Sequence, residues 1–323
     1  MRQRSLPFLT ILLIFVVSCG SYGTSASTPT PYVLATVAAD PSPTITPFQP
    51  QDYTAPEVPT QETQSVSDTL PQPAGQVTIM LFGSDQRPNQ GYYLTDVMML
   101  AIIKTDGSVS LVSFPRDLRV FIPTVGMEKL NAAMEYGGFE LFQSTMAFNF
   151  GITPQSFILT NFSGFQSVVD NLGGIDVNVG QTLVAARPGY PEGYTVYPGI
   201  VHMNGEMALW YVRSRMSTSD IDRLRRAQEV LIAISKRLFN LNALTRIPEL
   251  YQAYRSSVVT DLTLEDVLQL LPLLRIMDAS RVQRYAITFE DTTTWTEPGT
   301  GRYFLLPNSA AIRQILLQAI GTQ

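Results

Sequence analysis

The chain contains one cysteine and one histidine among its 323 residues. One cysteine cannot form a disulfide within the chain, and these two residues cannot supply the ligands of a Cys/His zinc site. A Ser–His–Asp or Cys–His catalytic site would need His202, which lies in a turn-like stretch without a paired motif. We interpret His202 as an ordinary surface or packing histidine. Carboxylates, arginines and a hard metal ion are then the candidate catalytic groups.

Charged residues are sparse, at 15% of the chain, and acidic residues outnumber basic ones to give a formal net charge of −5. A nucleic-acid-binding domain is expected to carry a basic surface or stripe, so this balance argues against a nucleic-acid partner. The hydrophobic fraction of 45% is large enough to fill a sizeable core.

The first 19 residues have the features of a lipoprotein signal peptide. Arg2 and Arg4 precede an apolar run, 6–17, that is too short to span a bilayer comfortably. The run ends in Val16-Val17-Ser18-Cys19-Gly20, which resembles a bacterial lipobox, and Cys19 is the predicted lipidation site. A plain secretory signal or a short membrane anchor is the alternative. Either interpretation places the protein outside the cytoplasm, and the lipid would anchor it to the outer face of the cell membrane.

Residues 20–75 differ in composition from the rest of the chain. Proline, threonine and serine dominate this segment, as in Thr28-Pro29-Thr30-Pro31, and it has no apolar period. Such a segment buries too little apolar surface to offset its chain entropy, so we predict a disordered stalk. The folded domain is predicted to span 76–323, with a core at 77–240 and a helical C-terminal part at 241–323.

Short apolar runs predict buried strands at 77–83, 97–103 and 109–113, and Asp106-Gly107 predicts a hairpin turn between the last two. The longest helix is expected to begin at Asp220, a favourable N-cap, because apolar residues recur there every three or four positions. Strands mixed with covering helices predict an α/β fold, a three-layer α-β-α sandwich around a mixed central sheet. Further strands are expected at 157–159 and 175–179, and further helices at 129–136, 139–149, 165–172, 247–256, 264–274 and 309–320.

Two aspartates lie at the ends of the first two predicted strands. Asp85 follows the first strand and Asp96 precedes the second. If these strands are neighbours, both carboxylates can converge on one rim of the sheet, where they would suit Mg²⁺ with water and phosphate as its other ligands. The alternative is a pair of solvated aspartates, one in a turn and one at the start of a strand.

Five arginines crowd into the fourteen residues from 213 to 226. They span the end of a predicted strand, a loop and the first turns of the long helix, whose amino end carries a positive dipole. Arginine favours bidentate capture of phosphate oxygens, and Arg116 would add another from the opposite side. With the two carboxylates, this pattern predicts a pyrophosphate–metal site, and a solvated basic face is the alternative. The five are Arg213, Arg215, Arg223, Arg225 and Arg226.

The segment from 98 to 150 has more bulky apolar side chains than one sheet face needs. Core packing explains most of them. The alternative is an internal tunnel for a long hydrocarbon tail, which methionine and aromatic walls would suit. The residues are Met98, Met99, Phe139, Leu141, Phe142, Met146, Phe148 and Phe150.

Eight sequence blocks, taken in order, resemble the pattern of the LytR–CpsA–Psr family and span residues 77 to 235, about half of the chain. Each block alone is weakly specific, whereas eight in the right order form a specific pattern. The blocks are Gly83-Ser84-Asp85-Gln86-Arg87, Thr95-Asp96-Val97-Met98-Met99-Leu100, Ser113-Phe114-Pro115-Arg116-Asp117, Lys129-Leu130-Asn131-Ala132-Ala133 with Gly137-Gly138, Val169-Asp170-Asn171-Leu172-Gly173-Gly174-Ile175-Asp176-Val177, Asn204-Gly205-Glu206-Met207-Ala208-Leu209, Tyr211-Val212-Arg213-Ser214-Arg215 and Asp220-Ile221-Asp222-Arg223.

The resemblance implies an enzyme on the outer face of the cell membrane that handles a glycopolymer such as teichoic acid or capsule. The polymer and its phosphate would move from a polyprenyl pyrophosphate carrier to a sugar hydroxyl of peptidoglycan. Magnesium is the implied cofactor, with Asp85 and Asp96 as its ligands. The implied partners are the lipid-linked glycopolymer, peptidoglycan and the membrane.

The resemblance also implies roles for the individual residues that match the family motifs. Arginines would clamp the pyrophosphate, Lys129 and Asn131 would support the same site, and Asp220 would order the arginine loop. A carboxylate near the metal, Asp96 or Asp220, is the candidate base for the sugar hydroxyl. The predicted catalytic residues are Asp96, Arg116, Arg215, Asp220 and Arg223, and the predicted substrate-binding residues are Arg87, Lys129, Asn131, Arg213 and Arg226.

The chain departs from the family pattern at three points. Leu94 stands where the family often has arginine, Ala227 stands where it commonly has glutamine, and a lipobox replaces the more usual transmembrane helix. The first two departures leave one phosphate contact open. Two other functions also stay open: hydrolysis of the same pyrophosphate by water, and non-catalytic binding of a lipid-linked glycan.

Overall fold

The computed structural model describes residues 69–86, 94–214, 220–240, 257–263, 265–266 and 281–321, with the backbone alone at 220 and 238–240. All of these residues belong to one compact unit. The predicted signal peptide, the predicted stalk up to residue 68, the helix expected at 247–256 and most of the helix expected at 264–274 lie outside the described residues.

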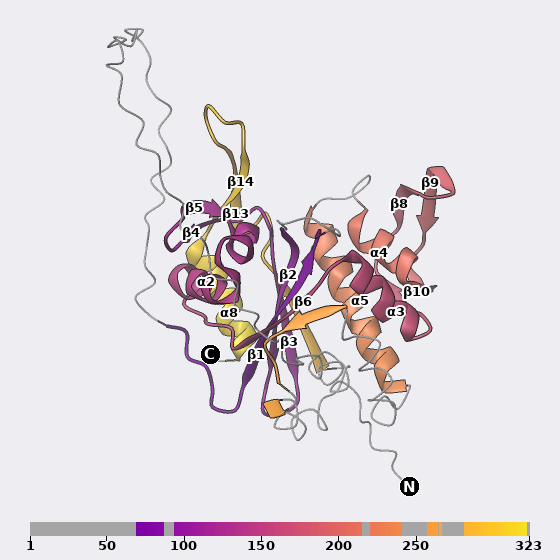
Figure 1. Cartoon of the computed structure of the whole chain (residues 1–323), viewed down its shortest axis with the longest axis horizontal. Helices are drawn as coiled ribbons and strands as arrows, with labels where there is room; N and C mark the ends of the chain where they lie inside the picture. The colour runs from indigo at the N-terminus through magenta and orange to yellow at the C-terminus, as the bar shows by residue number, and fades with distance from the viewer. Residues whose placement is uncertain are drawn as a thin grey trace, which may run out of the picture. The chain divides into compact units, whose positions relative to one another are not determined.

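Within these residues, the central sheet has six strands, and Figure 1 shows it standing between two groups of helices. Its middle is an antiparallel meander of β1, β2 and β3, in which the Asp106-Gly107 turn joins the last two strands. Strands β6 and β12 add parallel to β1 and β3, and β11 adds antiparallel to β6, so the sheet is mixed. In spatial order the strands are β11 (Val258–Thr260), β6 (Ser156–Thr160), β1 (Val77–Ser84), β2 (Thr95–Ile103), β3 (Val109–Phe114) and β12 (Val282–Ala286).

Side chains alternate between the two faces of the sheet along each central strand. On β2, Leu100 and Ile102 belong to one buried cluster, whereas Ala101 and Ile103 belong to another on the opposite face. Because the strands are apolar on both faces, both faces need a covering layer. A sheet that is apolar on both faces therefore forms the middle of three layers.

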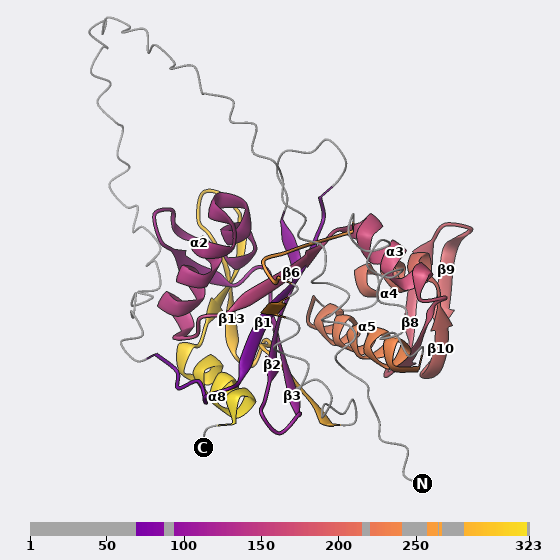
Figure 2. The same cartoon turned by 60° about the horizontal axis from the view of Figure 1, so that its bottom comes forward.

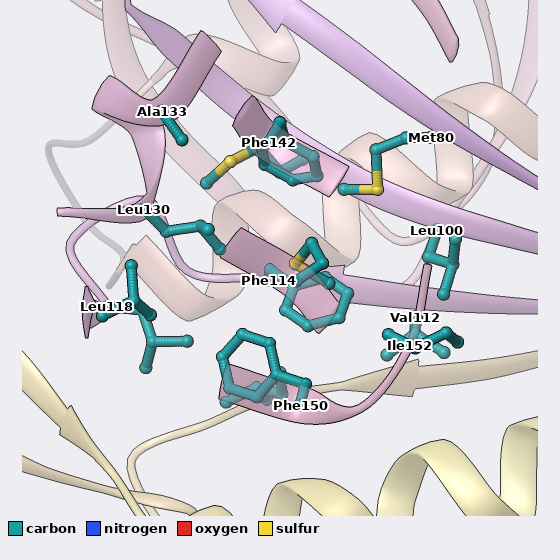
Figure 3. Close-up of a cluster of buried hydrophobic side chains, with 14 of the residues drawn as sticks. Met80, Leu100, Val112, Phe114, Leu118, Leu130, Ala133, Phe142, Phe150 and Ile152 are labelled. Carbon is teal, nitrogen blue, oxygen red and sulfur yellow. The ribbon is translucent and has the colours of Figure 1, made fainter. Parts of the chain in front are cut away.

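Helices α2 (Ala133–Phe150) and α8 (Ser309–Ile320) cover one face, which we call the closed face. Figure 3 shows its buried side chains packed together, and the rings of Phe82 and Phe142 meet edge to face with 4.8 Å between their centres. A single 3₁₀ turn, η1 (Leu130–Ala132), leads into α2. Gly138, with φ of 64°, kinks α2 where the sequence predicts two separate helical segments.

Helix α5 (Asp220–Asn240) lies against the other face, which we call the open face. Helices α3 (Phe162–Asn171) and α4 (Gly205–Arg213), with the β7–β10 pair, share a second buried cluster with α5. Figures 1 and 2 both show these elements on the side of the sheet opposite α2 and α8. The α/β sandwich of three layers is thereby confirmed.

Four two-stranded pairs lie outside the central sheet within the described part of the chain. They place side chains around its rims and carry several residues used below. The pairs are β4 (Arg119–Ile122) with β5 (Gly126–Lys129), β7 (Ile175–Val179) with β10 (Gly199–Met203), β8 (Leu183–Arg187) with β9 (Tyr190–Val196), and β13 (Thr292–Thr296) with β14 (Tyr303–Pro307).

The structure differs from the predicted domain organisation at two points. The folded part begins before residue 76, because Leu70 is only 1% exposed and its N–H donates to Gly151 O over 2.7 Å. The C-terminal part is also not purely helical, since β12 joins the central sheet and β13 pairs with β14. The run of threonines at 292–294 favours a strand, and this signal was overlooked. The helix expected at 309–320 is confirmed as α8.

Two local predictions were also wrong. The segment ending at Arg213 was expected as a strand, but it is helix α4, capped by the Asn204 side chain, which accepts from Met207 N at 2.9 Å. The cap stabilises a helix, although the aromatic residues that follow it prefer strands. His202 lies on strand β10 instead of in a turn, exposed, with Nδ1 2.7 Å from an oxygen of Asp176.

Candidate functional site

An apolar cavity lies between the open face of the sheet and helices α3, α4 and α5. It comprises about 1420 Å³ of space, its open mouth included. Its apolar walls come mainly from alternate residues of β1, β2, β3 and β6 on one side, with Phe82 at their edge, and from the three helices on the other. The apolar lining is Ile79, Leu81, Phe82, Val97, Met99, Ala101, Ile103, Val109, Leu111, Ile158, Phe162, Phe165, Val168, Leu209, Val212, Ala227, Val230, Leu231 and Ile234.

The charged groups that line this cavity lie at one end of it. Among the described lining residues they are Asp96, Arg213 and Arg223. Asp96 is at the start of β2, Arg223 at the start of α5 and Arg213 at the end of α4. From Asp96 to Ile103 the cavity follows β2 for about 23 Å, at about 3.3 Å per residue. The cavity therefore has a long apolar body and a charged head, which we call the polar end.

A β-bulge turns Asp96 toward the polar end. Gly83 pairs with Val97 and Ser84 pairs with Thr95, so Asp96 is an extra residue with no partner in the register. A bulge breaks the strict alternation of side chains and can redirect one of them. Asp96 thus lines the same cavity as Val97, its neighbour in sequence.

Arg116 joins the polar end through Asp96. Its Nη1 lies 2.8 Å from Asp96 Oδ1, and its Nε lies 3.4 Å from Asp117 Oδ2. Lys129 Nζ contacts the other oxygen of Asp117 at 2.5 Å. Lys129 therefore reaches the site through Asp117 and Arg116, and it is not among the cavity-lining residues.

Asn131 supports the same corner with its main chain. Its N–H donates to Arg116 O over 3.3 Å, and its carbonyl accepts from the Thr95 hydroxyl over 3.1 Å. Asn131 is only 4% exposed. These bonds fix Arg116 relative to the start of β2.

Arg223 and Arg213 face the cavity from two different helices. Arg223, on the first turn of α5, is 8% exposed. Arg213 ends α4, and its guanidinium lies 4.0 Å from the ring centre of Phe162, within cation–π range. Positive side chains and the amino end of α5 thus converge on the polar end.

Asp85 lies directly after β1, where it shapes the main chain. Its Oδ1 accepts from Leu94 N at 2.9 Å, and its own N–H donates to Leu94 O at 3.2 Å. This pair of bonds closes the segment between β1 and β2 and keeps Asp85 near the start of β2. Within the described residues, no cluster of three or more His, Cys, Asp or Glu side chains could hold a metal ion.

Arg226 was predicted to bind substrate, but its side chain lies in the protein interior. Its side chain is fully buried and does not line the cavity. It donates to the carbonyl oxygens of Tyr211 and Ser214, the latter over 2.6 Å, and so ties the end of α4 to α5. Burial lowers the pKa of Arg226 to about 10, which leaves the guanidinium charged at neutral pH. Arg226 is therefore a positioning residue for the arginine-bearing helices.

Arg225 points away from the cavity, as its place on α5 predicts. Its Nη1 contacts Glu229 Oε1 at 2.5 Å, and the second Glu229 oxygen accepts from the Tyr211 hydroxyl at 2.7 Å. Burial, together with the neighbouring Glu229 carboxylate, raises the pKa of Tyr211. This network engages Arg225 away from the cavity, whereas Arg223 lines the cavity.

The sequence matches a known protein family over most of its length. The model described as the LytR_cpsA_psr family matches residues 48–317. The chain belongs to the LytR_cpsA_psr family. The resemblance inferred from the eight sequence blocks is thereby confirmed.

Relatives within the LytR_cpsA_psr family are distant in sequence. The regulatory protein MsrR of Staphylococcus aureus (strain COL) is 25% identical over 249 residues, which cover 75% of each chain. A protein of Oceanobacillus iheyensis named polyisoprenyl-teichoic acid–peptidoglycan teichoic acid transferase TagU is 29% identical over 203 residues, covering 60% of this chain and 62% of its own. The crystal structure of B. subtilis TagV has a TM-score of 0.64 at 22% identity, covering 77% of this chain and 98% of TagV. A structure of TagT bound to LIIa-WTA has a TM-score of 0.60 at 24% identity, covering 76% and 91%.

In this member of the LytR_cpsA_psr family, core packing accounts for most of the bulky residues from 98 to 150, and the cavity has other walls than the alternative of a tunnel suggested. Of the eight bulky residues that prompted the expectation, Met99 alone is among the lining residues. Met98, Phe142, Met146 and Phe150 are buried on the closed face. Met98 lies on the opposite side of the sheet from Met99 because neighbouring residues of a strand point to opposite faces, and the other three belong to α2, which covers that side.

Cys19, Arg87, Arg215 and the side chain of Asp220 lie outside the described residues. Ser84, Thr160 and Asn161 line the cavity near the polar end and were not predicted. They could have been predicted from their positions at or just after the carboxyl ends of β1 and β6. No helix of the described residues is long and apolar enough to cross a membrane.

Proposed function

We propose that the protein transfers a phosphoryl-linked glycopolymer from a polyprenyl pyrophosphate carrier to a sugar hydroxyl of peptidoglycan. The observation that carries this proposal is the cavity, whose long apolar body ends in Asp96, Arg213 and Arg223. A polyprenyl pyrophosphate has the same two parts, a long hydrocarbon chain and a charged head. Membership of the LytR_cpsA_psr family and the printed name of the TagU relatives support the same reaction class.

The arginines would bind the pyrophosphate in the proposed reaction. Arg223 and Arg213 approach from the helices and Arg116 from the sheet, so charge on the phosphate oxygens would be neutralised from two sides. The sugar hydroxyl would attack the phosphorus that carries the polymer, and the bond to the polyprenyl phosphate would break. The hydroxyl proton would pass to a carboxylate, for which Asp96 and Asp220 are the candidates.

Asp85 and Asp96 are the proposed magnesium ligands. Each uses one oxygen, Oδ1, for a protein hydrogen bond, to Leu94 N and to Arg116 respectively. A carboxylate has a second oxygen, and Mg²⁺ in proteins takes one or two carboxylates together with water and phosphate. The residues therefore fit the ion, which would stabilise negative charge on the transferring phosphate.

The test uses the full chain in detergent, with a polyprenyl pyrophosphate-linked oligosaccharide as donor and peptidoglycan glycan strands as acceptor. Mass spectrometry is expected to find a phosphodiester between donor sugar and acceptor, lost on addition of EDTA and restored by Mg²⁺. Release of the oligosaccharide phosphate at one rate with or without acceptor would identify a hydrolase instead. Donor binding without any product would identify a non-catalytic binder.

We also propose that a lipid at Cys19 anchors the protein to the outer face of the cell membrane. The only cysteine of the chain follows an apolar run in a lipobox-like context, which supports this anchor. Replacement Cys19→Ser is expected to release the protein from membranes or to leave its precursor unprocessed. Membrane-bound protein of unchanged electrophoretic mobility would contradict the anchor.

A further inference from the structure

The β8–β9 hairpin carries an arginine enclosed by three aromatic rings. The guanidinium carbon of Arg187 lies 5.0 Å from the ring centre of Tyr194, 5.7 Å from that of Trp210 and 5.8 Å from that of Tyr190. The rings also contact one another, with 4.9 Å between Tyr190 and Tyr194 and 5.6 Å between Tyr194 and Trp210. We call Tyr190, Tyr194 and Trp210 the aromatic row.

The aromatic row is rigid at one end and exposed at the other. Trp210 Nε1 donates to Ala186 O over 2.9 Å, which fastens the hairpin to α4. The Arg187 side chain is only 13% exposed, and its Nη2 lies 3.3 Å from Glu206 Oε1. Tyr190, at the tip of the hairpin, is 50% exposed. Side chains that are already ordered lose little entropy on binding, so this row is pre-organised for a ligand.

Helix α4 connects the aromatic row to the polar end. Trp210 and Arg213 are three residues apart on α4, so they are neighbours on the helix surface, with about 5–6 Å between their Cβ atoms. Arg213 lines the polar end of the cavity. Figures 1 and 2 both show β8 and β9 standing beside α4. A ligand on the row would therefore lie next to the proposed reaction centre.

The chemistry of the hairpin favours a neutral sugar over an anionic polymer. A pyranose ring has a face of C–H groups that packs on an aromatic ring, and hydroxyls at its edge that donate to carboxylates. Glu206 is 53% exposed, and Glu192 is exposed on β9. These carboxylates can accept from sugar hydroxyls, whereas they would repel the phosphates of a teichoic acid chain. Arg187 offers little compensation because the rings and Glu206 enclose it.

We propose that the aromatic row, with Glu206, is an acceptor subsite that stacks a neutral sugar ring of a glycan strand beside the polar end. The role as acceptor site rests on the proposed transfer function, but the binding of sugar does not. The subsite holds one sugar by its apolar face and leaves a neighbouring sugar hydroxyl within reach of the phosphate held by the arginines.

The test exploits the presence of two tryptophans in the chain, Trp210 and Trp295. In the full-length Trp295→Phe variant, the remaining fluorescence reports on the aromatic row. Titration with chitotetraose, a neutral N-acetylglucosamine oligomer, is expected to change this emission saturably, and poly(glycerol phosphate) is expected to have no effect. Calorimetric titration of the unmodified protein measures the same binding without the substitution. No saturable binding of chitotetraose in either assay, or tighter binding of the anionic polymer, would overturn the subsite.

Substitutions at two exposed tyrosines separate the subsite from a general surface effect. Tyr190→Ala is expected to weaken chitotetraose binding about five- to tenfold, the size of one aromatic contact, and Tyr190→Phe is expected to retain it. Tyr197→Ala is the matched control, since Tyr197 is 69% exposed and lies outside the row. Equal losses for Tyr190→Ala and Tyr197→Ala would contradict the assignment.

The transfer assay distinguishes failure of the subsite from failure of the proposed function. Tyr190→Ala is expected to raise the KM for the glycan acceptor while kcat and the KM for the lipid-linked donor stay unchanged. Sugar binding without any transfer would leave the subsite standing and remove the transferase function. Transfer with an unchanged acceptor KM in Tyr190→Ala would remove the subsite alone.

Discussion

The closed and open faces of the central sheet are built from the same strands, but they are filled differently. On the closed face, Leu100 and Phe142 are fully buried, and aromatic rings from strand and helix meet edge to face. On the open face, small residues such as Gly83, Ala101 and Ala227 line the cavity. One face has a packed core and the other has room for a ligand.

This difference divides stability and function between the two faces. Protein interiors are normally packed as densely as organic crystals, so the residues that line the cavity forgo dispersion contacts that the closed face makes. Burial on the closed face, between the sheet and helices α2 and α8, is then expected to supply more of the stability. The open face is free to keep its volume and its charged end for a substrate.

The largest expected effect tests this division with the same deletion on both faces. Leu100→Ala, at a fully buried position of the closed face, is expected to lower the free energy of unfolding by about 3–5 kcal/mol, since it creates a new void. Leu81→Ala, in the wall of the cavity, is expected to cost only about 1–2 kcal/mol, because a void already exists there. Urea unfolding of both variants measures the two values. Equal costs would show that the open face is as tightly packed as the closed one.

The second effect concerns the charged end of the open face. Arg223→Ala is expected to reduce transfer about a hundredfold, since one charge-assisted contact that strengthens in the transition state contributes about 2.7 kcal/mol. Arg215→Ala is expected to reduce transfer by a similar factor if Arg215 also binds the pyrophosphate. Arg225→Ala is the matched control, because Arg225 is paired with Glu229 away from the cavity.

The arginine comparison is read in the transfer assay at matched melting temperatures. Equal losses in Arg223→Ala and Arg225→Ala, or no loss in either, would mean that Arg223 does not clamp the substrate. A loss confined to Arg223→Ala would separate the cavity side of α5 from its outer side.

Sequence patterns predicted the framework because the framework is set by local periodicity. Apolar runs located the three central strands, the Asp106-Gly107 turn located their hairpin, and the three-to-four spacing located α5 from Asp220 onward. The convergence of Asp96 and Arg223 could also be anticipated, since chain ends of neighbouring elements meet at one rim of a sheet. The strands, the turn and the helix depend on residues close together in sequence, and the convergence follows from where these elements begin and end.

Long-range features could not be read from the same patterns. The side of the sheet on which Met98 and Met99 lie depends on which helix covers which face. The sequence alone therefore did not identify the residues that line the cavity. The bulge at Asp96 depends on its pairing with β1, and the interior position of Arg226 depends on carbonyl groups of α4. Each of these is fixed by a partner distant in the chain.

The third effect reverses the deletion by adding volume to each face. Ala133→Leu, at a fully buried position on the closed face, is expected to destabilise the protein by about 1–3 kcal/mol through overpacking. Ala101→Leu, which points into the cavity, is expected to cost less than about 1 kcal/mol. It is also expected to lower the amount of polyprenyl phosphate that co-purifies with the protein, measured by mass spectrometry. Unchanged lipid with unchanged stability would mean that the cavity does not hold the hydrocarbon tail.

The smallest effect concerns Lys129, which lies outside the cavity and acts on it through two ion pairs. Lys129 Nζ contacts Asp117 at 2.5 Å, and Asp117 in turn lies 3.4 Å from Arg116 Nε. Without the lysine, Asp117 is expected to draw Arg116 away from Asp96, so Lys129→Ala should lower kcat about fivefold to tenfold, or roughly 1–1.4 kcal/mol. The KM for the glycan acceptor should stay unchanged, and Lys129→Arg should restore most of kcat because it keeps the charge. Lys104→Ala, at the opposite end of β2, is the matched control and should leave kcat unaltered. A rise in acceptor KM in Lys129→Ala, or failure of Lys129→Arg to rescue kcat, would show that Lys129 contacts substrate directly instead of positioning Arg116.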